Sequence, residues 1–122
     1  MKKYLWRGVE IYSKHIEIFE SILTQDHLPQ PKSEESEITN STIAPFSDRL
    51  MMFLKSIFGA TTIGFYGTAI GTCQRIDLAT NFSRLIVELG KFMEDGFNIL
   101  IENKWAEQPP LTDDREEIAT KK

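Results

Sequence analysis

The 122-residue sequence is poor in cysteine, histidine and clustered basic residues, and each shortage excludes a class of function. A single cysteine, Cys73, excludes an internal disulfide, so we expect a reducing, cytoplasmic compartment. Lysine and arginine number 14 against 18 acidic residues, and no dense basic patch offsets the net charge of -4. Because nucleic-acid binding depends on neutralising phosphate charge, this balance argues against a nucleic-acid partner. No apolar stretch follows the N-terminal lysines, so no signal peptide is expected.

The two histidines do not complete the motif of a carboxylate-bridged metal site. Such sites in helical bundles use Glu-x-x-His, and no glutamate precedes His15 or His27 at that spacing. We therefore predict no catalytic residue, no metal and no cofactor. His15 falls on the apolar side of a helical segment, where a hydrogen-bonded, part-buried histidine is a simpler interpretation than a ligand. The weak ligand candidates are His15 and the carboxylates Glu94 and Asp95, which are more typical of a solvated helix edge.

Apolar periodicity in the sequence predicts three long helices and an all-α fold. Apolar residues recur every three or four positions in segments 3–25 and 77–104, which is the pattern of amphipathic helices. Segment 47–74 is apolar on nearly all sides, so we expect that helix to be buried. Ser47 and Asp77 are the expected caps of the second and third helices.

The connections between these helices differ in length. Residues 26–46 contain three prolines and no helical period, which predicts an extended connection that can span the length of a bundle. Only two or three residues separate the second and third helices, so these two should be antiparallel. We interpret residues 1–110 as a single helical-bundle domain and residues 111–122 as a charged tail.

The stretch GATTIGFYGTAIGT, at residues 59–72, contains four glycines and admits three interpretations. A phosphate-binding loop would need a preceding strand and a lysine, which are missing. The 18 uncharged residues Ser56–Cys73 approach the length of a membrane span, but their threonines reduce the hydrophobicity, and we predict no membrane partner.

The favoured interpretation is a packing groove of small residues along the second helix. At 100° per residue, Ala60 and the three glycines that follow it in this stretch fall within an arc of about 60° around the helix axis. Another backbone, or large side chains such as Phe82 or Phe92, could settle into this groove. A leucine at Gly67 should then overpack it, at a cost of about 1–3 kcal/mol. The groove consists of Ala60, Gly64, Gly67 and Gly71.

Two neighbouring helices cannot surround a second helix that is apolar on nearly all sides. The uncovered side suggests a fourth helix from a partner chain. We therefore expect a homodimer or a higher homo-oligomer.

Four segments carry a family resemblance: STIAPFSDRLMMF, IGFYGTAIG, RIDLATNFSRLIVELGKFMEDGFNILIENKW and EQPP. They resemble a bacterial family of unknown function from spore-forming bacilli, whose members are similar to ferritin-like four-helix bundles and are described as spore-coat-related. The resemblance extends from Trp6 to Pro110. It implies a ferritin-like up-down bundle of three long helices in this chain, with a fourth helix missing or supplied by a partner. It also implies other spore-coat proteins as partners and deposition in the spore coat.

The sequence departs from that family pattern in two places. Lys104 stands where the pattern NGW has a glycine, so the usual glycine at the end of the third helix is missing. Family members also carry a helical segment before the part that matches Lys2–Gln25, which would make this chain a shortened copy. We expect a non-enzymatic helical-bundle protein that acts through self-association or protein assembly. The alternative is a small-ligand-binding or metal-dependent ferritin-like enzyme that uses His15 and acidic neighbours.

Overall fold

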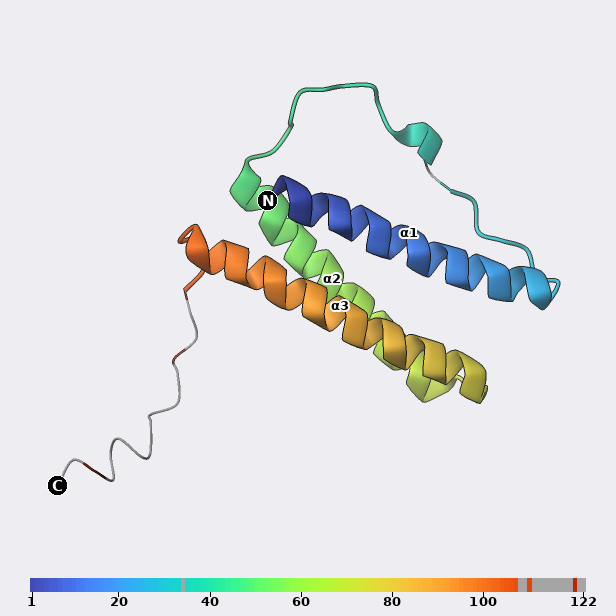
Figure 1. Ribbon diagram of the computed structural model, residues 1–122. Coiled ribbons are helices and arrows are strands. Elements are labelled where there is room, and N and C mark those ends of the chain that lie inside the picture. The colour runs from blue at the N-terminus through green and yellow to red at the C-terminus, as the bar shows by residue number, and fades with distance from the viewer. Residues whose placement is uncertain (34, 108–109, 111–119, 121–122) are drawn as a thin grey trace.

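The computed structural model describes residues 1–33, 35–107, 110 and 120, and its elements are helical throughout those residues. Helix α1 spans Lys2–Gln25, the short 3-10 turn η1 spans Glu35–Glu37, α2 spans Asp48–Thr72 and α3 spans Ile76–Glu102 (Figure 1). The all-α class and the three long helices are confirmed. The predicted tail, residues 111–122, lies outside the described residues except for Thr120.

The three helices lie side by side, with α1 and α2 running in one direction and α3 in the other (Figure 1). The chain returns from the end of α1 to the start of α2 along the length of the helices, as its prolines and polar composition predicted. Residues 73–75 join α2 to α3 in a tight antiparallel hairpin.

The N-terminal ends of α2 and α3 differ in how they are capped. Ser47 stands at the N-cap of α2, where its Oγ accepts a hydrogen bond from the backbone N–H of Leu50 at 3.3 Å. The prediction of Asp77 as the cap of α3 was wrong, because Arg75 occupies the N-cap and makes no side-chain capping bond. The Asp77 carboxylate is engaged instead by the Arg75 guanidinium, whose Nε and Nη2 donate to its two oxygens at 3.2 and 2.7 Å. Arg75 also pairs with Asp26, which ties the end of α1 to the hairpin.

The C-terminal ends of α1 and α3 share one backbone motif. Two residues after the last residue of each helix, the chain adopts a positive φ, at His27 (57°) and at Lys104 (58°). The next residue then donates back into the last turn, Leu28 to the Leu23 carbonyl and Trp105 to the Leu100 carbonyl, both at 2.8 Å. Lys104 therefore adopts the left-handed conformation that a glycine would adopt more readily.

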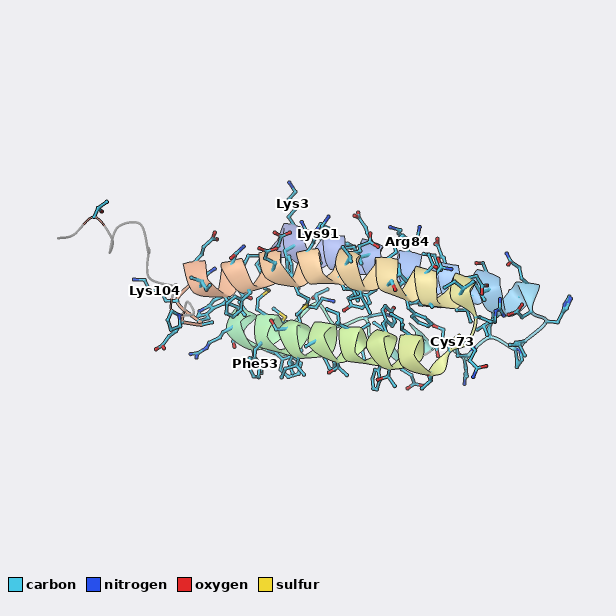
Figure 2. All side chains as sticks on the ribbon, turned by 90° about the horizontal axis from the view of Figure 1, so that it is seen from below. Lys3, Phe53, Cys73, Arg84, Lys91 and Lys104 are labelled. Carbon is cyan, nitrogen blue, oxygen red and sulfur yellow. The ribbon has the colours of Figure 1, made fainter. Side chains whose placement is uncertain are left out.

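The core lies where all three helices face one another, and it leaves most of α2 uncovered. The buried hydrophobic side chains are Tyr4, Met52, Leu85, Leu89, Phe92 and Leu100. Only Met52 and Gly59 are buried on α2, so the expectation of a buried second helix was wrong for this chain. The physical reason is geometric: α1 and α3 both lie on one side of α2, and side chains such as Phe53 extend from its other side (Figure 2).

Candidate functional site

Helix α2 carries more large exposed apolar side chains than either of the other two long helices. Its large apolar side chains on the outer side are between 40% and 70% exposed, namely Leu50, Phe53, Ile57, Phe58 and Phe65. No charged residue occurs between Ser56 and Cys73. Surfaces of this kind on a folded chain usually mark a site of contact with another protein or with a membrane.

The predicted groove of small residues lies on this outer side and is open within the chain. A Cβ atom built on Gly64, Gly67 or Gly71 would meet no other atom within 4 Å. The two aromatic residues expected to enter the groove pack elsewhere. The Phe82 ring lies against Phe19, with ring centroids 4.9 Å apart, and Phe92 stacks on Tyr4 at 4.3 Å.

Three other glycines provide the close packing inside the chain, and sequence reasoning did not single them out for it. A Cβ on Gly8 would lie 2.8 Å from Phe92 Cζ, and one on Gly96 would lie 2.7 Å from Tyr4 Cζ. A Cβ on Gly59 would lie 2.8 Å from Met93 Cε. The place of Gly96 in the apolar pattern of α3 could have indicated this role. In the structure, a large residue at this place would displace Tyr4.

An apolar groove of about 510 Å³ lies between α2 and α3 beside the N-terminal half of α2. Phe97 of α3 lines this groove and is 39% exposed. The other lining residues are Ser47, Arg49, Leu50, Phe53, Ser56, Leu100, Trp105 and Ala106. The outer side of α2 is therefore bulky and grooved at its N-terminal end, and its C-terminal half carries the small residues beside the exposed Phe65.

Among the described residues, α2 is the one helix with the length and composition of a membrane span. Its most apolar 18-residue window has a mean hydropathy of 1.2, and 11% of that window is buried. A core helix of a soluble protein passes the same test but is mostly buried, so the uncovered state of α2 is unusual.

A second candidate site is the buried His15, which is 1% exposed and connects all three helices. Its Nδ1 lies 3.1 Å from the hydroxyl of Tyr66 on α2, and its Nε2 lies 3.1 Å from Oε2 of Glu88 on α3. With the proton on Nε2, the ring donates to Glu88 and accepts from the Tyr66 hydroxyl, so all three groups are satisfied in the neutral tautomer. The structure thus shows the hydrogen-bonded, buried histidine that the sequence favoured.

The electrostatics of this cluster favour a packing role over acid–base chemistry. The Lys14 ammonium, 2.7 Å from Glu88 Oε1, and the His15 ring lower the pKa of the Glu88 carboxyl, against the opposing effect of its desolvation. Burial raises the pKa of the Tyr66 hydroxyl, so the phenol stays protonated and is a poor nucleophile. Lys55, whose Nζ lies 3.8 Å from the Tyr12 ring centroid, has its pKa lowered by burial.

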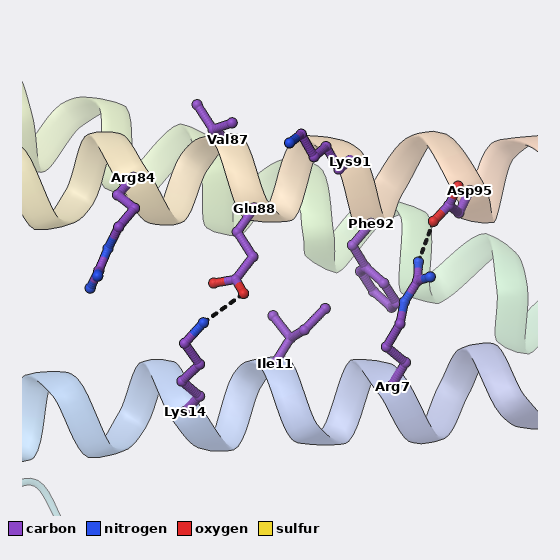
Figure 3. A pocket seen from close by; sticks show the side chains of 9 residues that line it. All are labelled: Arg7, Ile11, Lys14, Arg84, Val87, Glu88, Lys91, Phe92 and Asp95. Carbon is purple, nitrogen blue, oxygen red and sulfur yellow. Dashed lines mark hydrogen bonds and ion pairs between the residues drawn. The ribbon is translucent and has the colours of Figure 1, made fainter.

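Two carboxylates of α3, Glu88 and Asp95, face α1. Arg84 and Lys91 stand four residues before these carboxylates, a spacing that allows pairs along one helix, but both carboxylates pair with α1 instead. Lys14 of α1 pairs with Glu88, and Arg7 of α1 pairs with Asp95 (Figure 3). Lys14 likewise stands four residues after Glu10 but pairs with Glu88, because α1 lies close enough for its basic side chains to reach α3.

These pairs line an open groove of about 490 Å³ between α1 and α3 (Figure 3). The groove exposes charged side chains of both signs, most of which pair with each other. Of the weak ligand candidates, Asp95 lies in this groove, Glu94 is exposed elsewhere on α3 and His15 is buried below it. The structure does not bring these three together. Within the described part of the chain, no group of three or more His, Cys, Asp or Glu side chains could hold a metal ion.

Comparison with known proteins places the chain in a family without an assigned role. The family model described as "Protein of unknown function (DUF3231)" matches residues 1–118. The chain belongs to this family. No curated protein and no solved structure matches it. Membership in DUF3231 therefore supports the predicted family of unknown function, and the surfaces described above are the basis for a functional proposal.

Proposed function

We propose that this DUF3231 protein is a non-enzymatic helical-bundle protein that acts through self-association. The observation that carries the proposal is the uncovered outer side of α2, where five large apolar side chains and the stripe of small residues lie on one helix. Leaving this surface in water is unfavourable by roughly 25 cal/mol for each Å² of apolar area. Association that covers it recovers that free energy.

The exposed area of the chain supports association. A compact protein of 14.0 kDa exposes about 6,700 Å² by the usual scaling with mass, whereas this chain exposes 9993 Å². A standard protein–protein interface covers about 800 Å² on each partner. The outer side of α2 contributes to this exposed area, since Phe53, Phe58 and Phe65 are each between 55% and 70% exposed.

The test is the molar mass of the protein in solution at micromolar concentration, measured by size-exclusion chromatography with light scattering. We expect a dimer or a higher oligomer for the native sequence. Phe53→Glu should yield monomer, because it places a charge in the apolar surface. Val87→Glu is the matched control, since Val87 on α3 is 58% exposed and Phe53 is 55% exposed. A native protein that stays monomeric, or two variants that behave alike, would contradict the proposal.

Within this function we further propose a ferritin-like arrangement in which a partner supplies the fourth helix, and assembly with other proteins of the spore coat. The resemblance to spore-coat-related proteins of spore-forming bacilli supports this more specific role. A fluorescent fusion expressed during sporulation should move from the cytoplasm to the spore surface. A fusion that stays evenly cytoplasmic throughout sporulation would contradict the coat assignment and leave self-association standing.

Elemental analysis of the purified protein tests the non-enzymatic part of the proposal. We expect no stoichiometric iron, manganese or zinc. The interior polar cluster supports this expectation, because the His15 ring is already bonded on both nitrogens by protein groups. Stoichiometric metal would favour the metal-dependent alternative.

A further inference from the structure

We propose that two copies of this chain pair through α2 in an antiparallel arrangement, with Ala60 near the two-fold axis and Phe53 of each copy packed on Gly67 of the other. This inference rests on the proposed self-association and specifies its geometry. It depends on how side-chain bulk is distributed along the outer side of α2.

Bulky and small residues are segregated along one strip of the uncovered side of α2. Phe53, Ala60 and Gly67 are spaced by seven residues, so they lie within about 40° of one another around the helix axis. Phe53 occupies the N-terminal half of this strip, and the small residues Ala60, Gly64, Gly67 and Gly71 follow it, while the exposed Phe58 and Phe65 lie on the opposite flank of α2.

An antiparallel pair matches the bulky half of one helix to the small half of the other. A two-fold axis at Ala60 relates position 53 of one copy to position 67 of the second copy. The phenyl ring then fills the space that a missing Cβ leaves at Gly67, where nothing from the same chain lies within 4 Å. In a parallel pair, phenylalanine would meet phenylalanine and glycine would meet glycine, which leaves a clash at one end and a void at the other.

The ends of α2 are complementary in charge in the same arrangement. Helix α2 has no basic residue in its own last turn, where the unpaired carbonyl groups carry partial negative charge. Arg49, exposed at the other end of the helix, is related by the axis to the neighbourhood of Gly71 in the second copy. Each copy would thus supply the cation that the last turn of the other lacks.

A second copy fits this surface better than a lipid bilayer. Helix α3 lies antiparallel to α2 along its length and carries Arg84, Glu88, Lys91 and Asp95. Inserting α2 across a membrane would either carry these charges to membrane depth or separate α2 from α3, and both are costly. Pairing through α2 leaves the charged sides of α1 and α3 in water.

Cysteine cross-linking tests the direction of the pair. In a Cys73→Ser background, chains with Phe53→Cys are mixed with chains with Gly67→Cys and mildly oxidised, and the products are identified by mass. We expect the mixed disulfide to form at least tenfold faster than either like pair. Faster Phe53→Cys self-linking would show a parallel pair and overturn the proposal.

A second pair of variants keeps the test decisive if Phe53→Cys weakens association. Gly67→Leu should raise the dissociation constant of the dimer at least tenfold. Gly90→Leu should leave it unchanged, because Gly90 is a mid-helix glycine of α3 that also has no atom within 4 Å of a built Cβ. A dimer that tolerates Gly67→Leu overturns the antiparallel α2 pair but not self-association. A monomer that co-floats with phosphatidylglycerol vesicles overturns both.

Discussion

At the scale of single residues, the most constrained polar group is His15. Both ring nitrogens are hydrogen-bonded at 3.1 Å, the side chain is almost completely buried, and its partners come from α2 and α3. A buried polar group that loses its partner costs about 1–3 kcal/mol. His15 therefore selects one relative arrangement of the three helices, since only that arrangement satisfies all three groups.

Replacing His15 should lower the free energy of unfolding, and the size of the loss should depend on whether the Tyr66 hydroxyl is present. His15→Leu leaves the Tyr66 hydroxyl without its acceptor and Glu88 without one donor, so we expect a loss of about 1–3 kcal/mol or more in the free energy of unfolding. Tyr66→Phe removes the orphaned hydroxyl, so the double variant should cost less than the sum of the two single variants by about 0.5–3 kcal/mol.

Chemical denaturation of the four proteins in this cycle measures the coupling. Ser13→Leu is the control for adding a leucine to α1, because Ser13 is exposed two positions away, and its effect should stay within about 0.5 kcal/mol. Strictly additive effects of His15→Leu and Tyr66→Phe would show that the bond contributes nothing to stability.

The burial of His15 was predictable from sequence, but its partners were not. Its place on the apolar side of α1 indicated burial. The contact of Glu88 with α1 was not predictable, because periodicity describes one helix at a time and carries no information on where a neighbouring helix lies. Only the packing of α1 against α3 brings Lys14 and His15 to that carboxylate.

At the scale of the helices, the glycines divide into two groups with opposite roles. Gly8, Gly59 and Gly96 are buried at contacts between helices, where a Cβ would collide with a neighbouring side chain. Gly64, Gly67, Gly71 and Gly90 face open space in the single chain. The sequence identified the small-residue stripe by its spacing, but spacing alone does not say which stripe faces the chain and which faces a partner.

Substituting one glycine from each group in α3 should change stability in opposite directions. Gly96→Ala should destabilise by about 1–3 kcal/mol, because its Cβ would press on the Tyr4 ring, which stacks on Phe92 and has little room to move. Gly90→Ala should stabilise by up to about 1 kcal/mol through helix propensity alone.

Thermal denaturation of both variants measures the difference, with Gly90→Ala as the matched control on the same helix. Adding Tyr4→Phe to Gly96→Ala should recover part of the loss, because it removes the hydroxyl nearest the new methyl group. If the Gly96→Ala protein were as stable as the Gly90→Ala protein, the claim that Tyr4 packs too closely on Gly96 to admit a methyl group would be wrong.

At the scale of the whole molecule, the three-helix chain leaves one of its most apolar helices half uncovered. The number of helices, their limits to within about two residues and the antiparallel hairpin of α2 and α3 follow from periodicity and connection lengths. The burial of α2 did not follow, because hydropathy reports that a surface prefers to leave water and not which molecule covers it. Covering the exposed side of α2 would both stabilise the fold and hold two copies together, so stability and assembly are linked at this surface.

That linkage predicts a concentration-dependent melting temperature. Association stabilises the folded chain by mass action, so Tm of the native protein should rise by a few degrees for each tenfold increase in concentration. Gly67→Leu should remove this dependence, because the leucine fills the space that Phe53 of the second copy would occupy. Gly90→Leu should retain it, since Gly90 lies on α3.

Gly67→Leu should raise the stability of the single chain and lower that of the dimer. The Tm of the variant should therefore lie above that of the native protein at low concentration and below it at high concentration. In a dilute sample the variant should melt above the native protein, because leucine has a higher helix propensity than glycine, by somewhat less than the about 0.8–1.0 kcal/mol that separates alanine from glycine, and meets no atom of its own chain. In a concentrated sample it should melt below the native protein, which gains the stability of the dimer. The overpacking cost expected at Gly67 thus belongs to the interface and not to the single chain. A variant that melts below the native protein at every concentration would instead place an intrachain contact at Gly67.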